Sequence, residues 1–338
     1  MYQHFYGLRE LPFELTPNPD FLFLARQHRE ALSTLIYGLA SAKGVTALIG
    51  EAGTGKTTLL HAALRAEQCR HVNCVYLMNP TLTRAEFVEM LSVRFELSAH
   101  AARSKAAFLN ELDVRLRERR ARGQVTALVV DEAQSLSNEL LEEIRLLANS
   151  ETPTQKLLPL VLAGQPELKD RLNQTDLRQL KQRVTLRCEI MPFTVQDTAA
   201  YIAWRIRAAG GDAAKLFTRE AVMLIHERSA GIPRTISVIC DNALVTGFGM
   251  ARQPVNHDIV LEVVNDLDLR ETRSRDAFSG GSDDNLSTAS ADEEAPSPPS
   301  GRSLPGDQSG TAPLVPVEVD SSAVNSRNRP RFSLFGLR

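Results

Sequence analysis

The chain has 338 residues, of which 43% are hydrophobic and 24% are charged, and its formal net charge is −2. These values are typical of one large globular domain or two smaller ones, and they exclude binding to nucleic acid through overall charge, although a local basic face stays compatible with them. The four cysteines form no Cys-x-x-Cys pair, no targeting segment opens the chain, and no stretch has the roughly 18–20 apolar residues of a membrane helix, so we expect a cytoplasmic protein with reduced thiols.

Strand-like and helix-like segments alternate through the first part of the chain. An aromatic and proline-rich stretch comes first, and a predicted helix at about residues 28–39 follows it. Apolar runs of strand length lie at residues 45–49, 74–78, 125–130, 158–163 and 184–190, and helical patterns separate them at 58–65, 84–95, 107–120 and 138–147. Short, β-branched-rich runs are typical of a parallel sheet covered on both faces. The sequence therefore predicts a three-layer α/β core over residues 1–192.

The rest of the chain divides into two segments of different composition. Helical patterns at 197–208, 219–229, 233–247 and 257–267, with no strand pattern among them, predict a small all-helical domain at 193–272. After about residue 272 Ser, Gly, Pro and Asp dominate, and such a segment cannot bury enough apolar surface to offset the entropy lost on ordering. We expect a disordered tail at 273–338, whose basic and aromatic end is either a frayed terminus or a peptide that folds on a partner.

A phosphate-binding loop lies between the first predicted strand and the next helix. Residues 50–57 read Gly-Glu-Ala-Gly-Thr-Gly-Lys-Thr and match the P-loop pattern GxxxxGK[ST] in full. Its glycines let backbone amides turn towards phosphates, and the helix N-terminus adds partial positive charge. We expect Lys56 to contact the β- and γ-phosphates and Thr57 to coordinate Mg²⁺. The predicted nucleotide contacts are Gly50, Glu51, Ala52, Gly53, Thr54, Gly55, Lys56, Thr57 and Thr58.

Two adjacent carboxylates follow the strand at 125–130. The strand end places Asp131 and Glu132 beside the phosphates, at the carboxyl edge of the sheet. Asp131 is predicted to hold Mg²⁺ through its water shell, and Glu132 to activate the attacking water as a general base, which makes the chain a Mg²⁺-dependent ATPase. The gap between Lys56 and Asp131 leaves room for the strand at 74–78. That spacing fits the ATPase branch with an extra strand between the phosphate-loop strand and the acidic strand.

The order of these motifs resembles that of AAA+ ATPases, in which an α/β core and a helical lid enclose ATP and Mg²⁺. The resemblance implies that Gln165, which follows the strand at 158–163, senses the γ-phosphate; as a residue before Pro166 it also suits a helix start. It further implies that Arg234, in the sequence Gly-Ile-Pro-Arg at 231–234, reaches the nucleotide from the lid. A plain structural turn is the alternative for that motif.

The same resemblance implies a homo-oligomer whose sites are completed by a neighbouring subunit. In AAA+ proteins an arginine just before the fifth strand reaches the neighbour's γ-phosphate. By position Arg183 fits best and Arg178 is the second candidate, while an ordinary basic helix face explains either residue alone nearly as well. The N-terminal segment is expected to lie near the adenine, with Leu15 or Pro17 touching the base. Most of its aromatic and proline residues serve packing in this interpretation; they are Phe13, Pro19, Phe21 and Phe23.

The motifs narrow the resemblance further. The opening at 5–23, Arg-Leu-Leu-Ala-Asn at 145–149 and Leu-Ala-Gly-Gln-Pro-Glu-Leu at 162–168 resemble the ExeA/GspA-type ATPases of general secretion. TniB-type transposition ATPases and ATPases linked to exopolysaccharide export have similar motifs. The resemblance implies that ATP turnover remodels or assembles a secretion or cell-envelope complex, either in the cytoplasm or peripheral to the inner membrane through that partner. Secretion members typically continue into a membrane helix and a peptidoglycan-binding domain, where we expect only the tail here.

Two other functions fit the same fold. A transposition-type regulator bound to DNA is the main alternative, and the basic stretch at 115–122 is compatible with it, although helix C-termini favour cations in any case. A nucleotide-controlled scaffold with little turnover is the third possibility, and the presence of Glu132 argues against it.

Overall fold

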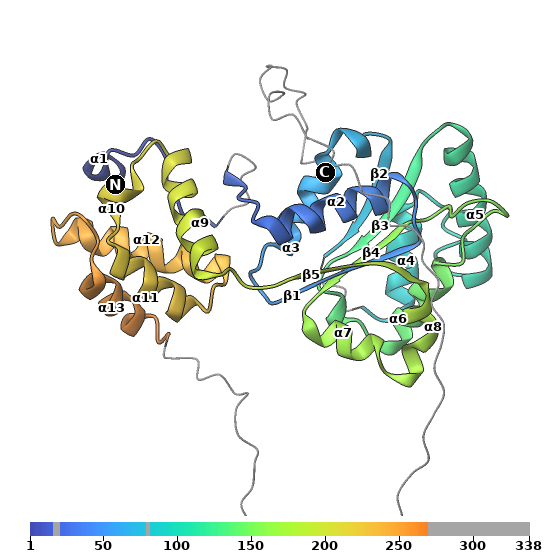
Figure 1. Ribbon diagram of the computed structural model, residues 1–338. Coiled ribbons are helices and arrows are strands. Elements are labelled where there is room, and N and C mark those ends of the chain that lie inside the picture. Colours follow the sequence, from blue (N-terminus) through green and yellow to red (C-terminus); the bar gives the residue numbers. More distant parts are fainter. Residues whose placement is uncertain (16–20, 79–81, 270–338) are drawn as a thin grey trace, which may run out of the picture. The chain divides into compact units, whose positions relative to one another are not determined.

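The structure is a computed structural model that describes residues 1–15, 21–78 and 82–269 (Figure 1). The predicted tail at 273–338 lies outside the described residues, as do Pro17 and Pro19. All described residues belong to one compact unit, Met1–Asp276.

Five parallel strands form one sheet in the order β2-β3-β4-β1-β5. The strands are β1 (Val45–Gly50), β2 (Val72–Leu77), β3 (Val125–Val130), β4 (Leu160–Gly164) and β5 (Val184–Ile190). This confirms the predicted α/β class. In space the strand between β1 and β3 is β4, whereas β2, which lies between them in the sequence, pairs only with β3 at the edge of the sheet. The extra strand of the predicted branch is therefore not the one at 74–78.

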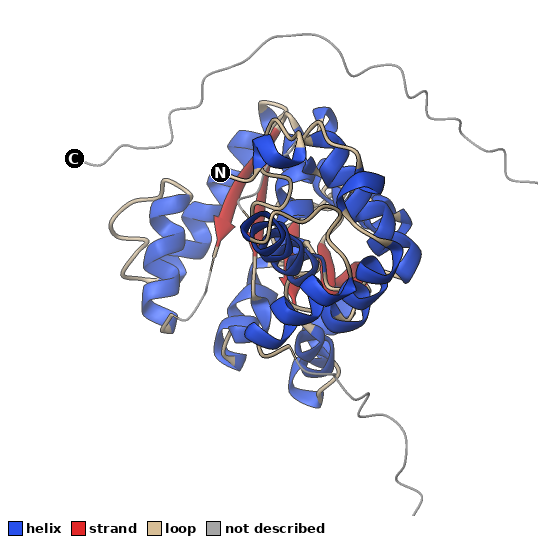
Figure 2. Ribbon diagram, turned by 90° about the vertical axis from the view of Figure 1, so that its left-hand side faces the viewer, coloured by secondary structure: helices blue, strands red, loops and turns tan. Residues whose placement is uncertain are grey.

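Successive side chains of a strand point to opposite faces of the sheet, and along the central strands β1, β3 and β4 both faces are buried. On β3, Leu128 and Val130 belong to one hydrophobic core, and Ala127 and Val129 belong to another. This double burial explains why the central strands read as continuous apolar runs. Helices lie on both sides of the strands (Figure 2). One core is shared with α2 (Arg26–Ala40) and α3 (Lys56–Arg65), and the other with α4 (Arg84–Arg94), α5 (Lys105–Ala121), α6 (Asn138–Leu147), α7 (Pro166–Leu172) and α8 (Arg178–Arg183).

A third hydrophobic core joins the helices that follow β5. Thr194 begins this group with a capping box, in which its hydroxyl accepts from the Asp197 amide and the Asp197 carboxylate accepts from the Thr194 amide. The helices are α9 (Val195–Ala208), α10 (Ala213–Leu216), α11 (Arg219–Ser229), α12 (Pro233–Gly249) and α13 (His257–Asp266). Of the helices in the described residues, none is long and apolar enough to cross a membrane.

The N-terminal segment packs with these later helices rather than with the sheet. It begins with the short α1 (Gln3–Tyr6), and the Tyr6 hydroxyl donates to the Leu244 carbonyl at 3.1 Å. The Phe13 ring meets Phe217 edge-to-face, with 6.3 Å between centroids. The sequence placed residues 1–13 with the α/β core, because an aromatic run indicates burial but not the element that covers it.

Candidate nucleotide-binding site

The loop at residues 50–57 connects β1 to α3 and turns tightly. Gly53 and Gly55 adopt positive φ angles of 80° and 97°, which L side chains rarely allow. Lys56 begins α3 and is 5% exposed; its ammonium donates to the carbonyls of Gly50 at 2.8 Å and Glu51 at 3.0 Å. Burial lowers the pKa of Lys56, while the carboxylates of Glu132 and Asp131 favour its charged form. The loop thus holds a buried amine where the predicted phosphates lie.

Asp131 is tied directly to the loop. Its Oδ2 accepts from the Thr57 hydroxyl at 2.6 Å and from the Tyr76 hydroxyl at 2.9 Å. Burial and the neighbouring Asp131 raise the pKa of Tyr76 well above its usual range, so the phenol stays a neutral donor. Sequence reasoning missed Tyr76, which reaches Asp131 because β2 pairs with β3.

A hydroxyl and a carboxylate oxygen side by side fit Mg²⁺, which is commonly held by one or two protein oxygens together with phosphates and water. The described residues contain no group of three or more His, Cys, Asp and Glu side chains that could hold a metal by itself. Thr57 and Asp131 therefore suit a magnesium ion that arrives with a nucleotide rather than a permanent metal centre.

Glu132 lies beside this pair in a left-handed backbone conformation, with φ at 53°. Its Oε2 accepts from the Gln134 amide at 2.6 Å and from the Gln165 amide at 3.3 Å. The Gln165 backbone N–H in turn donates to Gln134 Oε1 at 3.1 Å. The structure thus brings the predicted base and the predicted sensor together, with Gln134 bonded to both; no role for Gln134 was evident from the sequence.

Helix α12 contacts the phosphate loop through its backbone. The Arg234 amide donates to the Gly53 carbonyl at 3.2 Å, and a Cβ on Gly53 would come within 2.9 Å of the Arg234 Cβ. Arg234 lies in the first turn of α12, where Pro233 occupies the first helical position. Gly231 has φ at 72°, and its carbonyl accepts from the Phe193 amide at 2.8 Å.

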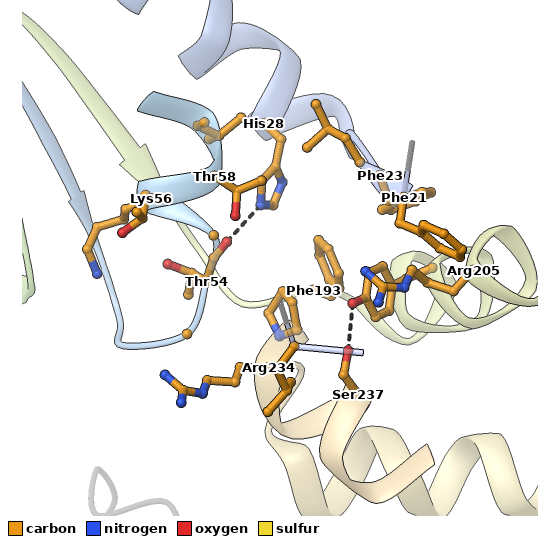
Figure 3. A pocket seen from close by; sticks show the side chains of 18 of the residues that line it. Phe21, Phe23, His28, Thr54, Lys56, Thr58, Phe193, Arg205, Arg234 and Ser237 are labelled. Carbon is orange, nitrogen blue, oxygen red and sulfur yellow. Dashed lines mark hydrogen bonds between the residues drawn. The ribbon is translucent and has the colours of Figure 1, made fainter. Parts of the chain in front are cut away.

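These groups surround a cavity of about 330 Å³, within the range of small-ligand sites. Residues 53–59, Glu132 and Arg234 line it. Figure 3 shows Thr54 and Lys56 on the loop and Arg234 on a separate helix. Leu15, one of the two residues predicted to lie near the base, is also in the lining. The aromatic residues Phe21, Phe23 and Phe193 face the same cavity.

The remaining predicted residues do not line the cavity. Gly50, Glu51 and Ala52 form the first half of the loop, and Gln165 is held behind Glu132. Arg178 is exposed and Arg183 is half-buried, at the two ends of α8. Both arginines therefore stand apart from the cavity of their own chain, which is compatible with a role in a neighbouring subunit but does not test it.

Comparison with known proteins identifies the architecture. Residues 39–172 match the family model described as an AAA domain. The chain is 38% identical over 272 residues to General secretion pathway protein A from Aeromonas hydrophila, a match that includes 80% of this chain. It spans about half of that relative, 49% of its length. The resemblance to this branch of the AAA+ proteins that the motifs indicated is confirmed.

Solved structures with the same fold are more distant in sequence. CDC6P from Pyrobaculum aerophilum aligns with a TM-score of 0.58 and 18% identity, covering 75% of this chain and 70% of that one. The ORC2 protein of Aeropyrum pernix aligns with a TM-score of 0.55 and 15% identity, covering 75% and 71%. Drosophila ORC bound to DNA gives 0.57 and 19%, covering 79% and 65%. At these identities the matches establish the fold alone.

Proposed function

We propose that this chain, a member of the AAA class of P-loop NTPases, binds ATP with Mg²⁺ and hydrolyses it to ADP and phosphate. One observation carries the proposal: Glu132 and the loop at 53–58 line the same cavity, with Asp131 hydrogen-bonded to Thr57 at 2.6 Å beside them. A carboxylate adjacent to a phosphate loop is the arrangement that a general base for water requires.

In this proposal each side chain has a separate task. Lys56 exchanges its carbonyl partners for phosphate oxygens, and Thr57 and Asp131 supply oxygens to Mg²⁺. The ion, when bound, neutralises charge on the phosphates. Glu132 accepts the proton of the attacking water through Oε1, because Oε2 is already held by the two glutamine amides. Arg234 adds positive charge from the lid side, where its backbone meets Gly53.

We further propose that hydrolysis remodels or assembles a partner complex of secretion or the cell envelope. The similarity to General secretion pathway protein A supports this assignment. The working location is the cytoplasm or the inner-membrane periphery, through that partner. The active unit is a homo-oligomer in which Arg183 completes the neighbour's site. Of the predicted domains, the core at 1–192 loses its N-terminal residues 1–13 to the lid at 193–272, on which they pack, and 273–338 is the tail.

Two substitutions test the ATPase. Lys56→Ala should abolish ATP binding measured by calorimetry, because it removes the buried cation of the loop. Glu132→Gln should keep binding within about threefold but lower phosphate release at least about a hundredfold, the usual contribution of a general base. Normal affinity in the lysine variant would exclude the phosphate site, and normal turnover in the glutamine variant would exclude Glu132 as the base.

The structure weakens the case that the basic stretch at 115–122 binds DNA. Arg115 donates to the Glu96 carbonyl, Arg117 and Arg119 pair with Asp113 and Glu96, and Arg120 donates to Gln155. These arginines thus already serve the packing of α5. An ATP-dependent shift of DNA at low salt that disappears steeply as salt is raised would nevertheless establish the alternative.

A further inference from the structure

His28 is a buried histidine in the wall of the nucleotide cavity, contributed by α2 (Figure 3). The side chain is 4% exposed, and its Nε2 lies 3.1 Å from the Thr54 carbonyl oxygen of the phosphate loop. A carbonyl oxygen can only accept, so this contact assigns the proton to Nε2. Nδ1 then carries a lone pair. It is buried and has no hydrogen-bond partner among the described residues.

The surroundings of His28 suit a flat aromatic ligand. Its ring lies 5.2 Å from the ring of Phe193, which in turn meets Phe23 edge-to-face at 5.7 Å. Leu15 and Phe21 line the same cavity. Apolar and aromatic walls with few polar groups are typical of sites that bind a base. This part of the cavity adjoins the phosphate loop through Thr54.

The other polar groups in that wall already have partners. Tyr201 and Ser237 share a hydrogen bond of 2.7 Å between their hydroxyls. Arg205 donates to the carbonyls of Pro12 and Glu14. Among these lining groups, Nδ1 of His28 is the one that lacks a partner. Nδ1 is enclosed by protein atoms in this structure, so a donor reaches it when the surrounding side chains shift. Leaving a buried acceptor unpaired is costly, so a ligand that brings an N–H to this position is favoured.

We propose that Nδ1 of His28 accepts a hydrogen bond from the exocyclic amine of the bound base, and that His28 thereby selects a 6-amino purine over a 6-oxo purine. Adenine presents an N–H₂ donor at this position, whereas guanine presents an O6 acceptor. An acceptor opposite the Nδ1 lone pair leaves two buried groups unpaired. The inference rests on the proposed nucleotide site and adds the residue that reads the base.

This role requires a neutral His28 imidazole, and the buried position of the side chain favours that state. Burial lowers the pKa of His28, and this effect exceeds the opposing influence of the Thr54 carbonyl and the Asp197 carboxylate. Protonation would turn Nδ1 into a donor and reverse its preference.

A matched pair of substitutions separates the two nitrogens. Asn places its carbonyl oxygen near the position of Nδ1, so His28→Asn keeps the acceptor and loses the donor to Thr54. Gln places its amide nitrogen near the position of Nε2, so His28→Gln keeps the donor and loses the acceptor. We would measure dissociation constants of ATP, GTP and ITP, each with Mg²⁺, by calorimetry on the full chain. Thermal unfolding would check that each variant is folded.

We expect the wild type to bind ATP roughly 10- to 100-fold more tightly than ITP, the range set by an unpaired buried acceptor. ITP is the informative competitor, because it lacks the 2-amino group of GTP. His28→Asn should retain most of this ratio, although its affinity for both nucleotides falls. His28→Gln should bring the ratio to within about threefold.

Two results would overturn the inference. An unchanged ATP-to-ITP ratio in His28→Gln, with ATP binding intact, would show that His28 only holds Thr54. A wild type that binds ATP and ITP equally would show that no group reads position 6. Failure of the wild type to bind any of the three nucleotides would remove the proposed function and the inference together, so the two failures are distinguishable.

Discussion

Gln134 offers the sharpest test of how Glu132 is held. Its amide donates to Glu132 Oε2 at 2.6 Å, and its Oε1 accepts from the Gln165 backbone at 3.1 Å. Arg171 fixes the backbone there by donating to the Gln134 carbonyl at 2.6 Å. The substitution Gln134→Glu has the same shape and keeps an oxygen for Gln165, but it replaces the donor to Glu132 with a second carboxylate. It therefore removes the hydrogen bond to Glu132 and adds a negative charge beside it.

The expected effect follows from the contact that is lost. A hydrogen bond to a charged group contributes about 1.5–3 kcal/mol, which corresponds to roughly a 10- to 150-fold change in rate. The loss should appear in kcat, because Glu132 then no longer points one oxygen at the water. Gln134 does not line the cavity, so ATP affinity should stay within about threefold.

Phosphate release would be measured over a range of ATP concentrations with Mg²⁺, and ATP binding by calorimetry. Gln174→Glu is the matched control, since Gln174 is an exposed glutamine after α7 and should leave both quantities unchanged. Wild-type kcat in Gln134→Glu would refute the positioning role. A raised kcat would refute it as well, and would instead identify Gln134 as a restraint on the base.

Two further predictions concern the assembly and the lid. Arg183→Ala subunits keep Glu132, and Glu132→Gln subunits keep Arg183, so mixing the two should restore part of the ATP hydrolysis that each variant loses alone. If no activity returns, the site is not built from the Glu132 of one subunit and the Arg183 of its neighbour. Gly231→Ala should cost more than about 2 kcal/mol in urea unfolding, because φ is 72° and a Cβ would lie 2.2 Å from the Phe193 carbonyl oxygen. Gly249→Ala is its control and should be neutral or slightly stabilising, since nothing lies within 4 Å of the added Cβ.

Local sequence was sufficient for the elements with strong periodicity. The ranges 125–130 and 184–190 match β3 and β5 to the residue, as do 138–147 for α6 and 219–229 for α11. The helices α1 and α10 have four residues each, too few to show a period. The phosphate loop could be recognised because its glycines, lysine and threonine are consecutive in the chain.

The contacts that the sequence did not reveal are all between distant segments. Tyr76 reaches Asp131 only because β2 is the neighbour of β3 in the sheet. The order of strands in a sheet cannot be predicted from their spacing along the sequence. His28 gains its position from the approach of α2 to the loop at Thr54. Gln134 lies two residues after Glu132, but its role depends on Gln165, which is 31 residues away. A motif identifies which groups are available, and the fold decides which of them meet.

The contacts between the phosphate loop and its surroundings connect the two ends of a nucleotide to the lid. Gly53 bonds to the Arg234 amide of α12, and the next residue, Thr54, bonds to His28. The His28 ring packs on Phe193, whose amide bonds to Gly231 at the start of the lid motif. A nucleotide bound as we propose, with its phosphates on the loop and its base at His28, would therefore act on both of these contacts at once. This arrangement gives nucleotide state a direct physical route to the orientation of α12.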